Sequence, residues 1–543
     1  MKLMLIGDRK RRQQGGVLSG VLIITAFLSI IAGTVMTEVS SHFLISRSLV
    51  NKVATEATTT SAVEEAVNFL HSAPRPLDTS CTSLSPRVVT LNGMTAAASY
   101  VKCAAVISGN PSPGLTKLPS NSHSFEHDGT HVVLPGRDDY LIGDSNGDVY
   151  DYAFGGSTLR WPAFQIKGGQ ISGPAIAMPD GSRISYLVPV SSPNQVKKNK
   201  CRNDCVALLT EDAGSVSFTC FMDIDSGTVR AAPAAGQRFP NLTYFGDDQG
   251  VLFAYTATHD GNCAQQATFD GDQSVIAGPL VFPGSASSTD QIYVLVSDGS
   301  DSELVRYSYT SGKFTLADSL PLPFSTANGM ALEQPNLPAK VAISFSDGGV
   351  AMVQIGTNFS LTLLPSGGVG TGINGAPHWC HCPGGADLIG LSGDNDTLYL
   401  LDAGMNKVAS YDVGQPIGTT PAADSAGDWF VGAEDGELYE VVPPPGQSGL
   451  VLGATFGKAG SEFGTSTIEG DCGANICVYS ASADGHAYLA RLDARKADVV
   501  ACITSSTPAC QPGFNPRLWA RIEAGSGADP KVIHIQGWSY YSP

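Results

Sequence analysis

Residues 138–177 read DDYLIGDSNGDVYDYAFGGSTLRWPAFQIKGGQISGPAIA, and this stretch decides the fold. A short apolar run leads into the tight Asn146-Gly147 turn, and a second alternating run follows the turn directly. An Asn-Gly pair between two such runs is a strong short-range signal of a β-hairpin. A glycine turn and a third run ending near Trp161 come next, and a run of small residues then opens another unit. The stretch therefore predicts a unit of short antiparallel strands.

The same strand–turn–strand pattern recurs along the chain. Its turns are marked by Gly147, Gly214, Gly250, Asp301, Gly349, Asp396, Gly436 and Gly485. Successive marks are 67, 36, 51, 48, 47, 40 and 49 residues apart. Repeats of roughly 40–50 residues with four strands each are typical of β-propellers. We therefore expect a mainly β fold, an eight-bladed propeller with seven blades as the alternative. The C-terminal run 531–543 is expected to pair with the first blade, which would close the ring and remove a free edge.

The units resemble the repeats of PQQ-like propellers of the quinoprotein or BamB type. Asp-Gly and Leu-Tyr, which are part of that repeat, stand in DGELYEVV, and Leu-Tyr stands again in DNDTLYLLDA. The tryptophan of the repeat is present in one unit only, as Trp161, shifted by about one place. The resemblance implies the fold of about four hundred residues, but it does not imply a particular chemistry.

The first forty residues combine a basic start with a long apolar run. Lys10, Arg11 and Arg12 precede Val17–Met36, twenty residues without a charge. As a helix this run measures about 30 Å, which matches the hydrocarbon core of a bilayer. The basic flank predicts a short cytoplasmic tail. The rest of the chain is then expected outside the cytoplasm, anchored in the inner membrane.

The junction between these two parts resembles the leader of type IV pilin-like proteins. Gly15-Gly16 ends the basic segment and the apolar run follows at once, as in the class III signals that a prepilin peptidase cuts. The resemblance implies cleavage between Gly16 and Val17, and packing of the helix against other pilin-like subunits. Val21 stands at the fifth mature position, where major pilins carry glutamate, which implies a minor pilin or tip pseudopilin. An uncleaved signal anchor with a helical stalk is the alternative.

Composition and periodicity divide the chain into segments. We predict a basic leader over 1–16, a transmembrane helix over 17–36, an amphipathic stem helix over 37–72, a Pro/Ser-rich linker over 73–125 and the propeller over 126–543.

Charge and cysteine content constrain the partners and the compartment. The formal net charge is −18, and removing the five basic and one acidic residues of 1–16 makes it −22. Such a negative chain repels phosphate, so nucleic-acid binding is disfavoured. Twelve cysteines, all beyond the apolar run, indicate disulfides formed outside the cytosol. The candidate pairs are Cys81–Cys103, Cys201–Cys205, Cys220–Cys263, Cys472–Cys477 and Cys502–Cys510.

Two stretches contain residues that could bind metal. DSNGDVYD places Asp144, Asn146, Asp148 and Asp151 in a spacing that resembles half of an EF-hand-like calcium loop. The glycine comes one place early and the distal glutamate is missing, so an ordinary hairpin turn is the alternative. APHWCHCPGG gathers four ligands of the kind that copper or zinc prefers. These are His378, Cys380, His381 and Cys382, with a Cys380–Cys382 disulfide as the alternative.

The motifs favour binding over catalysis. No catalytic residue is assigned, and enzymatic use of PQQ is disfavoured because no adjacent cysteine pair is present. Calcium is the candidate ion, and no cofactor is expected with certainty. The leading hypothesis is a non-enzymatic minor subunit, membrane-anchored or pilus-associated, whose propeller binds a surface protein or glycan at a filament tip or the cell surface. The alternatives are a membrane-tethered periplasmic quinoprotein-like enzyme and a scaffold propeller for envelope assembly.

Overall fold

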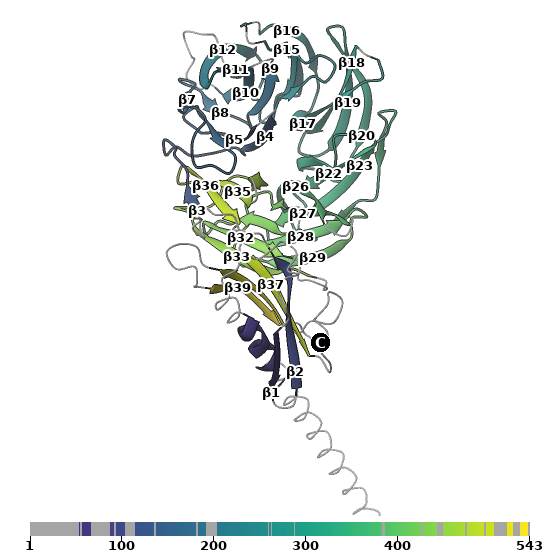
Figure 1. Cartoon of the computed structure of the whole chain (residues 1–543). Coiled ribbons are helices and arrows are strands. Elements are labelled where there is room, and N and C mark those ends of the chain that lie inside the picture. Colours follow the sequence, from purple (N-terminus) through teal and green to yellow (C-terminus); the bar gives the residue numbers. More distant parts are fainter. Residues whose placement is uncertain are drawn as a thin grey trace, which may run out of the picture.

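A computed structural model of the chain shows a β-propeller above a smaller sheet (Figure 1). Apart from gaps of one to three residues, it describes residues 54, 57–66, 87–91, 94–103, 115–191, 204–442, 449–503, 518–524 and 533–540. The predicted leader, the apolar run 17–36, the Gly16–Val17 cleavage site and most of the stem lie outside these residues. No helix in the described part is long and apolar enough to span a membrane.

The described strands form the eight blades that the repeat pattern predicts. Blade 1 has β4 (Thr130–Leu134), β5 (Arg137–Gly143), β6 (Asp148–Ala153) and β7 (Phe164–Gln165). Blade 2 has β8 (Gln170–Ile171), β9 (Ile176–Asp180), β10 (Arg183–Ser191), β11 (Asp204–Asp212) and β12 (Ser215–Ile224). Blade 3 has β13 (Ala234–Ala235), β14 (Leu242–Gly246), β15 (Val251–Thr256) and β16 (Gln265–Asp270). Blade 4 has β17 (Ser274–Pro283), β18 (Thr289–Ser297), β19 (Ser302–Thr310) and β20 (Lys313–Pro321).

The second half of the ring repeats this order. Blade 5 has β21 (Ala327–Leu332), β22 (Ala339–Phe345), β23 (Gly349–Ile355), β24 (Leu361–Leu363) and β25 (Gly367–Gly368). Blade 6 has β26 (Ile373–Cys382), β27 (Ala386–Gly393), β28 (Thr397–Asp402) and β29 (Lys407–Asp412). Blade 7 has β30 (Ala422–Ala423), β31 (Trp429–Gly432), β32 (Glu437–Val442) and β33 (Val451–Lys458). Blade 8 has β34 (Ile468–Cys472), β35 (Asn475–Ser482), β36 (His486–Leu492) and, from far upstream, β3 (Leu115–Lys117).

Strand β3 closes the ring, and the predicted closure by residues 531–543 is wrong. β3 pairs antiparallel with β36, so it supplies the fourth strand of blade 8. The pairing continues past the strand, because the backbone N–H of Leu118 donates to the carbonyl of Ala487 over 2.9 Å. The C-terminal strand β39 (Ile533–Tyr540) pairs instead with β38 (Leu518–Ala524), outside the propeller. The edge of β36 that would otherwise be unpaired is therefore covered by a strand from the N-terminal part of the chain.

A ninth sheet lies below the ring, and the helical residues 57–66 lie beside it (Figure 1). Its strand order is β1-β2-β37-β38-β39, with β1 (Arg87–Leu91), β2 (Met94–Cys103) and β37 (Lys496–Ile503). The predicted linker 73–125 thus contains two strands of this sheet as well as β3, and the propeller ends near Leu492 rather than at 543. Because β2 and β37 are neighbours, the whole propeller is inserted between two paired strands.

The ninth sheet and the helical residues before it contain buried small side chains. Residues 57–66 are helical, and their buried positions, Thr58, Thr59, Ala62, Val63 and Ala66, recur with the spacing of one helix face. In β2 the run 96–99 is also buried and consists of three alanines and a serine. Small side chains on both elements leave room for a close approach of neighbouring backbones.

Neighbouring blades pack through glycines in their second strands. In β27 a Cβ on Gly390 would stand 1.9 Å from the ring of buried Trp429 in blade 7. In β14 a Cβ on Gly246 would stand 2.6 Å from Val275 of blade 4. The glycine in each case leaves room for a large apolar side chain of the next blade. The core of the ring is thus a series of such interblade contacts.

Candidate functional site

The predicted calcium loop is a hairpin turn whose carboxylates are already hydrogen-bonded. Asp144 Oδ1 accepts from the backbone N–H groups of Asn146 and Asp148, each over 2.9 Å. Asp144 Oδ2 accepts from the Tyr150 hydroxyl over 2.9 Å, and burial raises the pKa of Asp144. Asp148 Oδ2 accepts from the Asn146 side chain. Asp151 contacts Arg137 and Tyr186 instead, so its carboxylate is engaged outside this turn.

Blade 3 repeats this turn with Asp247, which accepts from the N–H groups of Gln249 and Val251, and blades 7 and 8 use an aspartate directly before the turn glycine in a related way. In blade 7, Asp435 accepts from the N–H of Glu437 and from the Tyr439 hydroxyl. In blade 8, Asp484 accepts from the N–H of His486 and from the Tyr488 hydroxyl. The aspartate fixes the hairpin and the tyrosine links it to the following strand. Among the described residues no group of three or more His, Cys, Asp or Glu side chains could hold a metal ion.

The predicted transition-metal residues lie on β26 and are used in other contacts. Cys380 and Cys382 form a disulfide, which was the alternative interpretation of this stretch. Burial lowers the pKa of His378 to about 4, and its ring packs edge-on against Trp429. His381 is exposed, and its Nδ1 lies 2.9 Å from Asp387 Oδ1, an interaction that raises its pKa. The thiols are therefore not available as thiolate ligands.

The other disulfide predictions are confirmed in part. Cys220 and Cys263 are bonded, which joins blade 2 to blade 3 as predicted. Cys205 and Cys477 are also disulfide-bonded, but their predicted partners, Cys201 and Cys472, have no described side chains. The pairs Cys81–Cys103 and Cys502–Cys510 likewise stay predictions.

A buried network of charges joins blades 1 and 2. Arg137, at the start of β5, contacts both carboxylate oxygens of Glu211 at 3.0 and 2.8 Å. Its Nε lies 2.7 Å from Asp139, and its Nη2 lies 3.3 Å from Asp151 and 2.6 Å from the Tyr186 hydroxyl. The Tyr186 hydroxyl lies 2.8 Å from Asp151 and 2.5 Å from Glu211. Sequence reasoning missed this network, although the RDD run at 137–139 was an available signal.

Carboxylates outnumber cations in this network. Arg160 supplies the second cation, 2.8 Å from Asp139. Burial and the neighbouring Asp139 raise the pKa of Asp151 to about 7 against the opposing hydrogen bond from Tyr186. Burial alone would raise the pKa of Glu211 too, but hydrogen bonds from Arg137 and Tyr186 outweigh it and leave that pKa lowered. The network therefore holds one carboxyl group that is partly protonated near neutral pH.

This protonation predicts how stability depends on pH. Since the pKa of Asp151 is raised in the folded state, the folded chain holds a proton that the unfolded chain releases from about pH 4 upward. The contribution of Asp151 should therefore fall as pH rises from about 4 to about 7, by up to about 1.4 kcal/mol per pH unit, and stay constant above that. Urea unfolding at several pH values in this range measures the free energy of unfolding. This free energy should fall less steeply with pH in Asp151→Asn than in the unmodified chain. An unchanged slope would contradict the assignment.

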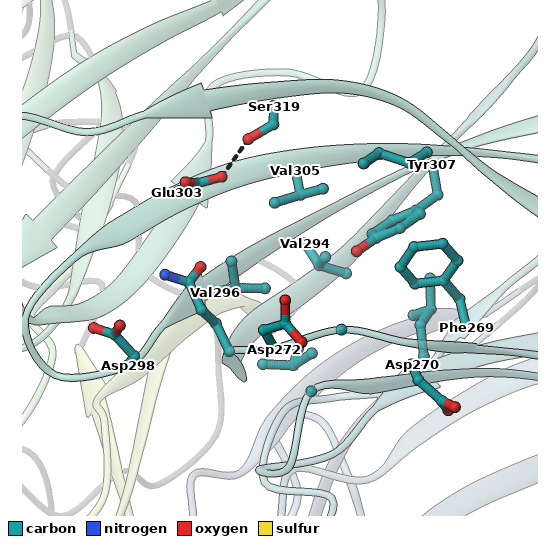
Figure 2. A pocket seen from close by; sticks show the side chains of 16 residues that line it. Phe269, Asp270, Asp272, Val294, Val296, Asp298, Glu303, Val305, Tyr307 and Ser319 are labelled. Atoms are coloured by element: carbon teal, nitrogen blue, oxygen red, sulfur yellow. Dashed lines mark hydrogen bonds between the residues drawn. The ribbon is translucent and has the colours of Figure 1, made fainter.

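The pocket between blades 3 and 4 is the candidate binding site on the propeller (Figure 2). It is a cavity of about 420 Å³ between β15 and β16 of blade 3 and the four strands of blade 4. Its inner wall is apolar and includes Val294, Val305 and the tilted pair Phe269–Tyr307, whose ring centroids are 4.8 Å apart. Leu316, on the outermost strand of blade 4, is 51% exposed at the mouth.

Acidic side chains surround this apolar wall. The pocket is lined by Asp270, Asp272, Asp298 and Glu303, and by no Lys, Arg or His among the described residues. Glu303 accepts a hydrogen bond from Ser319, drawn as a dashed line in Figure 2. The repeat pattern did not single out these residues. Two acid-rich turns in consecutive repeats, FDGDQ at 269–273 and SDGSDSE at 297–303, were the signal that could have found them.

Comparisons with known proteins bear on the fold. The sequence matches no known family model and no curated protein. Among solved structures, Sqt1 of Saccharomyces cerevisiae superposes with a TM-score of 0.53 at 13% identity, over 70% of this chain and 100% of that one. The Dos1 propeller gives 0.50 at 10% identity, over 69% and 94%. BamB from Moraxella catarrhalis gives 0.46 at 12% identity, over 69% and 97%. At these identities the likeness to Sqt1 and to the Dos1 propeller shows a β-propeller fold, and it shows nothing about a ligand.

Proposed function

We propose that this chain is a minor pilin-like subunit that displays a binding propeller outside the cell, on a filament or at the membrane surface. The supporting observation is the insertion of the propeller between β2 and β37. Both connections to the ring leave from the same small sheet, and the helical residues 57–66 precede that sheet in the chain. A rigid unit of this kind, following an apolar N-terminal segment, would act as a pedestal for the ring.

The insertion also favours a low copy number for such a subunit. A helix-borne sheet can pack side by side with other subunits, whereas an eight-bladed ring above it is far wider than a helix of about 10–12 Å. Rings on adjacent subunits would collide, so a subunit of this shape suits a filament tip or an isolated position. Val21 in place of the usual glutamate agrees with this. The binding role rests on the rigid ring, whose loops and interblade pocket face solvent.

Mass spectrometry of the mature N-terminus tests this proposal. In cells with prepilin peptidase the protein should begin at Val17, and in cells without it at Met1. Gly16→Leu should abolish processing, whereas Gly15→Ala should leave it intact. A wild-type chain that begins at Met1 in cells carrying the peptidase would contradict the pilin-like function and favour the signal anchor. Dye-linked dehydrogenase activity after addition of PQQ and calcium would favour the enzyme instead.

A further inference from the structure

We infer that the pocket between blades 3 and 4 binds an arginine side chain presented by a protein partner. This inference rests on the proposed display function and deepens it, because it names the site and the chemistry of the ligand. The binding step itself does not depend on filament assembly, so it can be tested on the purified chain.

Charge is the first argument. In the described part of the chain, four acidic residues and no Lys, Arg or His line the cavity, and the Asp298 carboxylate is engaged by the backbone of its own turn. Asp270, Asp272 and Asp298 are exposed, while Glu303 is half-buried on β19. Low-dielectric walls concentrate the field of such a cluster inside the cleft. A cation is therefore the complementary ligand.

The apolar wall indicates what kind of cation fits. A hard metal ion needs six to eight closely spaced oxygens, which a wall of valines and aromatic rings does not provide. A guanidinium group on an aliphatic stem satisfies both surfaces, since it is weakly hydrated, stacks on aromatic faces and pairs with carboxylates through a fork of N–H donors. A cavity of about 420 Å³ also lies in the range of small-ligand pockets.

The Tyr307 hydroxyl is the second, independent argument. Tyr307 is only 6% exposed, yet the structure gives its hydroxyl no hydrogen-bond partner among the described residues. Figure 2 shows the hydroxyl directed into the pocket, toward the side of Asp272. A Cβ added to Gly271 would lie 3.9 Å from this oxygen, so the backbone between Asp270 and Asp272 passes close to it. The ring is buried while the hydroxyl opens into the pocket, so its oxygen is free to accept a hydrogen bond from a ligand.

The field at this hydroxyl agrees with a cationic ligand. Burial, together with the carboxylates of Glu303 and Asp272, raises the pKa of Tyr307 to about 12. The phenol therefore stays neutral and can accept a hydrogen bond from a guanidinium N–H while the ring of Phe269 flanks the stem.

The test uses the full chain in detergent and a dye-labelled, end-blocked nine-residue peptide of Gly, Ser and Ala with one central arginine. Fluorescence anisotropy at low salt should show saturable binding, and the citrulline peptide, which has the same shape without the charge, should bind about tenfold more weakly. The double variant Asp272→Asn/Glu303→Gln should weaken arginine-peptide binding about tenfold. Tyr307→Phe, which keeps the ring, should weaken it severalfold.

A matched control separates the pocket from net charge. Asp225→Asn/Glu462→Gln removes the same two charges at exposed positions outside the pocket and should leave the affinity unchanged. Equal losses in both double variants, or equal binding of the arginine and citrulline peptides, would overturn the inference. Agmatine binding as tightly as the peptide would assign the pocket to a small amine and overturn the protein partner. The N-terminal processing experiment is unaffected by any of these results.

Discussion

Arg137→Ala is expected to lower the free energy of unfolding by about 3–5 kcal/mol, because it removes the central cation of a buried network. Asp139 and Asp151 are 1% and 0% exposed, and Glu211 is 7% exposed. Without Arg137, only Arg160 remains to balance the three carboxylates. Two of them would then have to take up protons or pull water into the interface between blades 1 and 2.

The midpoint of urea unfolding, followed by tryptophan fluorescence, measures this loss. Arg183→Ala is the matched control, since Arg183 is on blade 2 and pairs with Asp212 at the surface, where the side chains are 37% and 61% exposed. An exposed pair of this kind contributes at most about 1 kcal/mol. If Arg137→Ala and Arg183→Ala lower the free energy of unfolding equally, Arg137 is not needed to balance the buried carboxylates.

The number of blades could be predicted from the sequence because hairpin turns are local. Gly147 has a φ of 80° at the predicted Asn-Gly turn, and Gly436 has a φ of 81° at the corresponding turn of blade 7. One of the eight turn marks was misplaced. Gly214 lies between β11 and β12, whereas the marked turn of the other blades lies between strands that correspond to β10 and β11 of blade 2. The equivalent connection of blade 2 runs from 192 to 203, which explains the irregular steps of 67 and 36 residues.

Closure of the ring could not be predicted in the same way. Strand β3 has three residues, too few to show an alternating pattern, and its partner Ala490 is 375 positions from Leu115. The C-terminal strand has a stronger β pattern, which made it the apparent candidate. Only the three-dimensional arrangement shows that β39 pairs with β38 and so belongs to the sheet that contains β2 and β37.

The pocket and the charge network were missed for a related reason. Their members come from separate strands, so nothing in a single sequence places Glu303 beside Asp272 or Arg137 beside Glu211. Spacing along one strand predicted the calcium and transition-metal sites instead, and the structure uses those residues for turns, for a disulfide and for the core. Local patterns identify hairpins well, but sites between blades depend on the packing of one sheet on the next.

Leu118→Asp is expected to destabilise the ring by at least about 4 kcal/mol, because it places a carboxylate in the apolar seam between blades 1 and 8. Leu118 follows β3, is 1% exposed and packs in a cluster with Tyr140, Tyr479 and Leu489. Loss of this contact should release β3 from β36 and leave blade 8 with an open edge. Hydrogen exchange of 475–492 should then rise, together with a fall in the urea midpoint.

Val133→Asp is the control for the ring-closure prediction, since Val133 on β4 is 72% exposed and a charge there should change stability by less than about 0.5 kcal/mol. Leu118→Ala removes the packing without adding a charge and should give an intermediate loss of about 2–4 kcal/mol. If Leu118→Asp leaves both the midpoint and the exchange of blade 8 as they are in Val133→Asp, the short N-terminal strand does not hold the ring closed. The graded order Val133→Asp, Leu118→Ala, Leu118→Asp is the result that a ring closed through β3 requires.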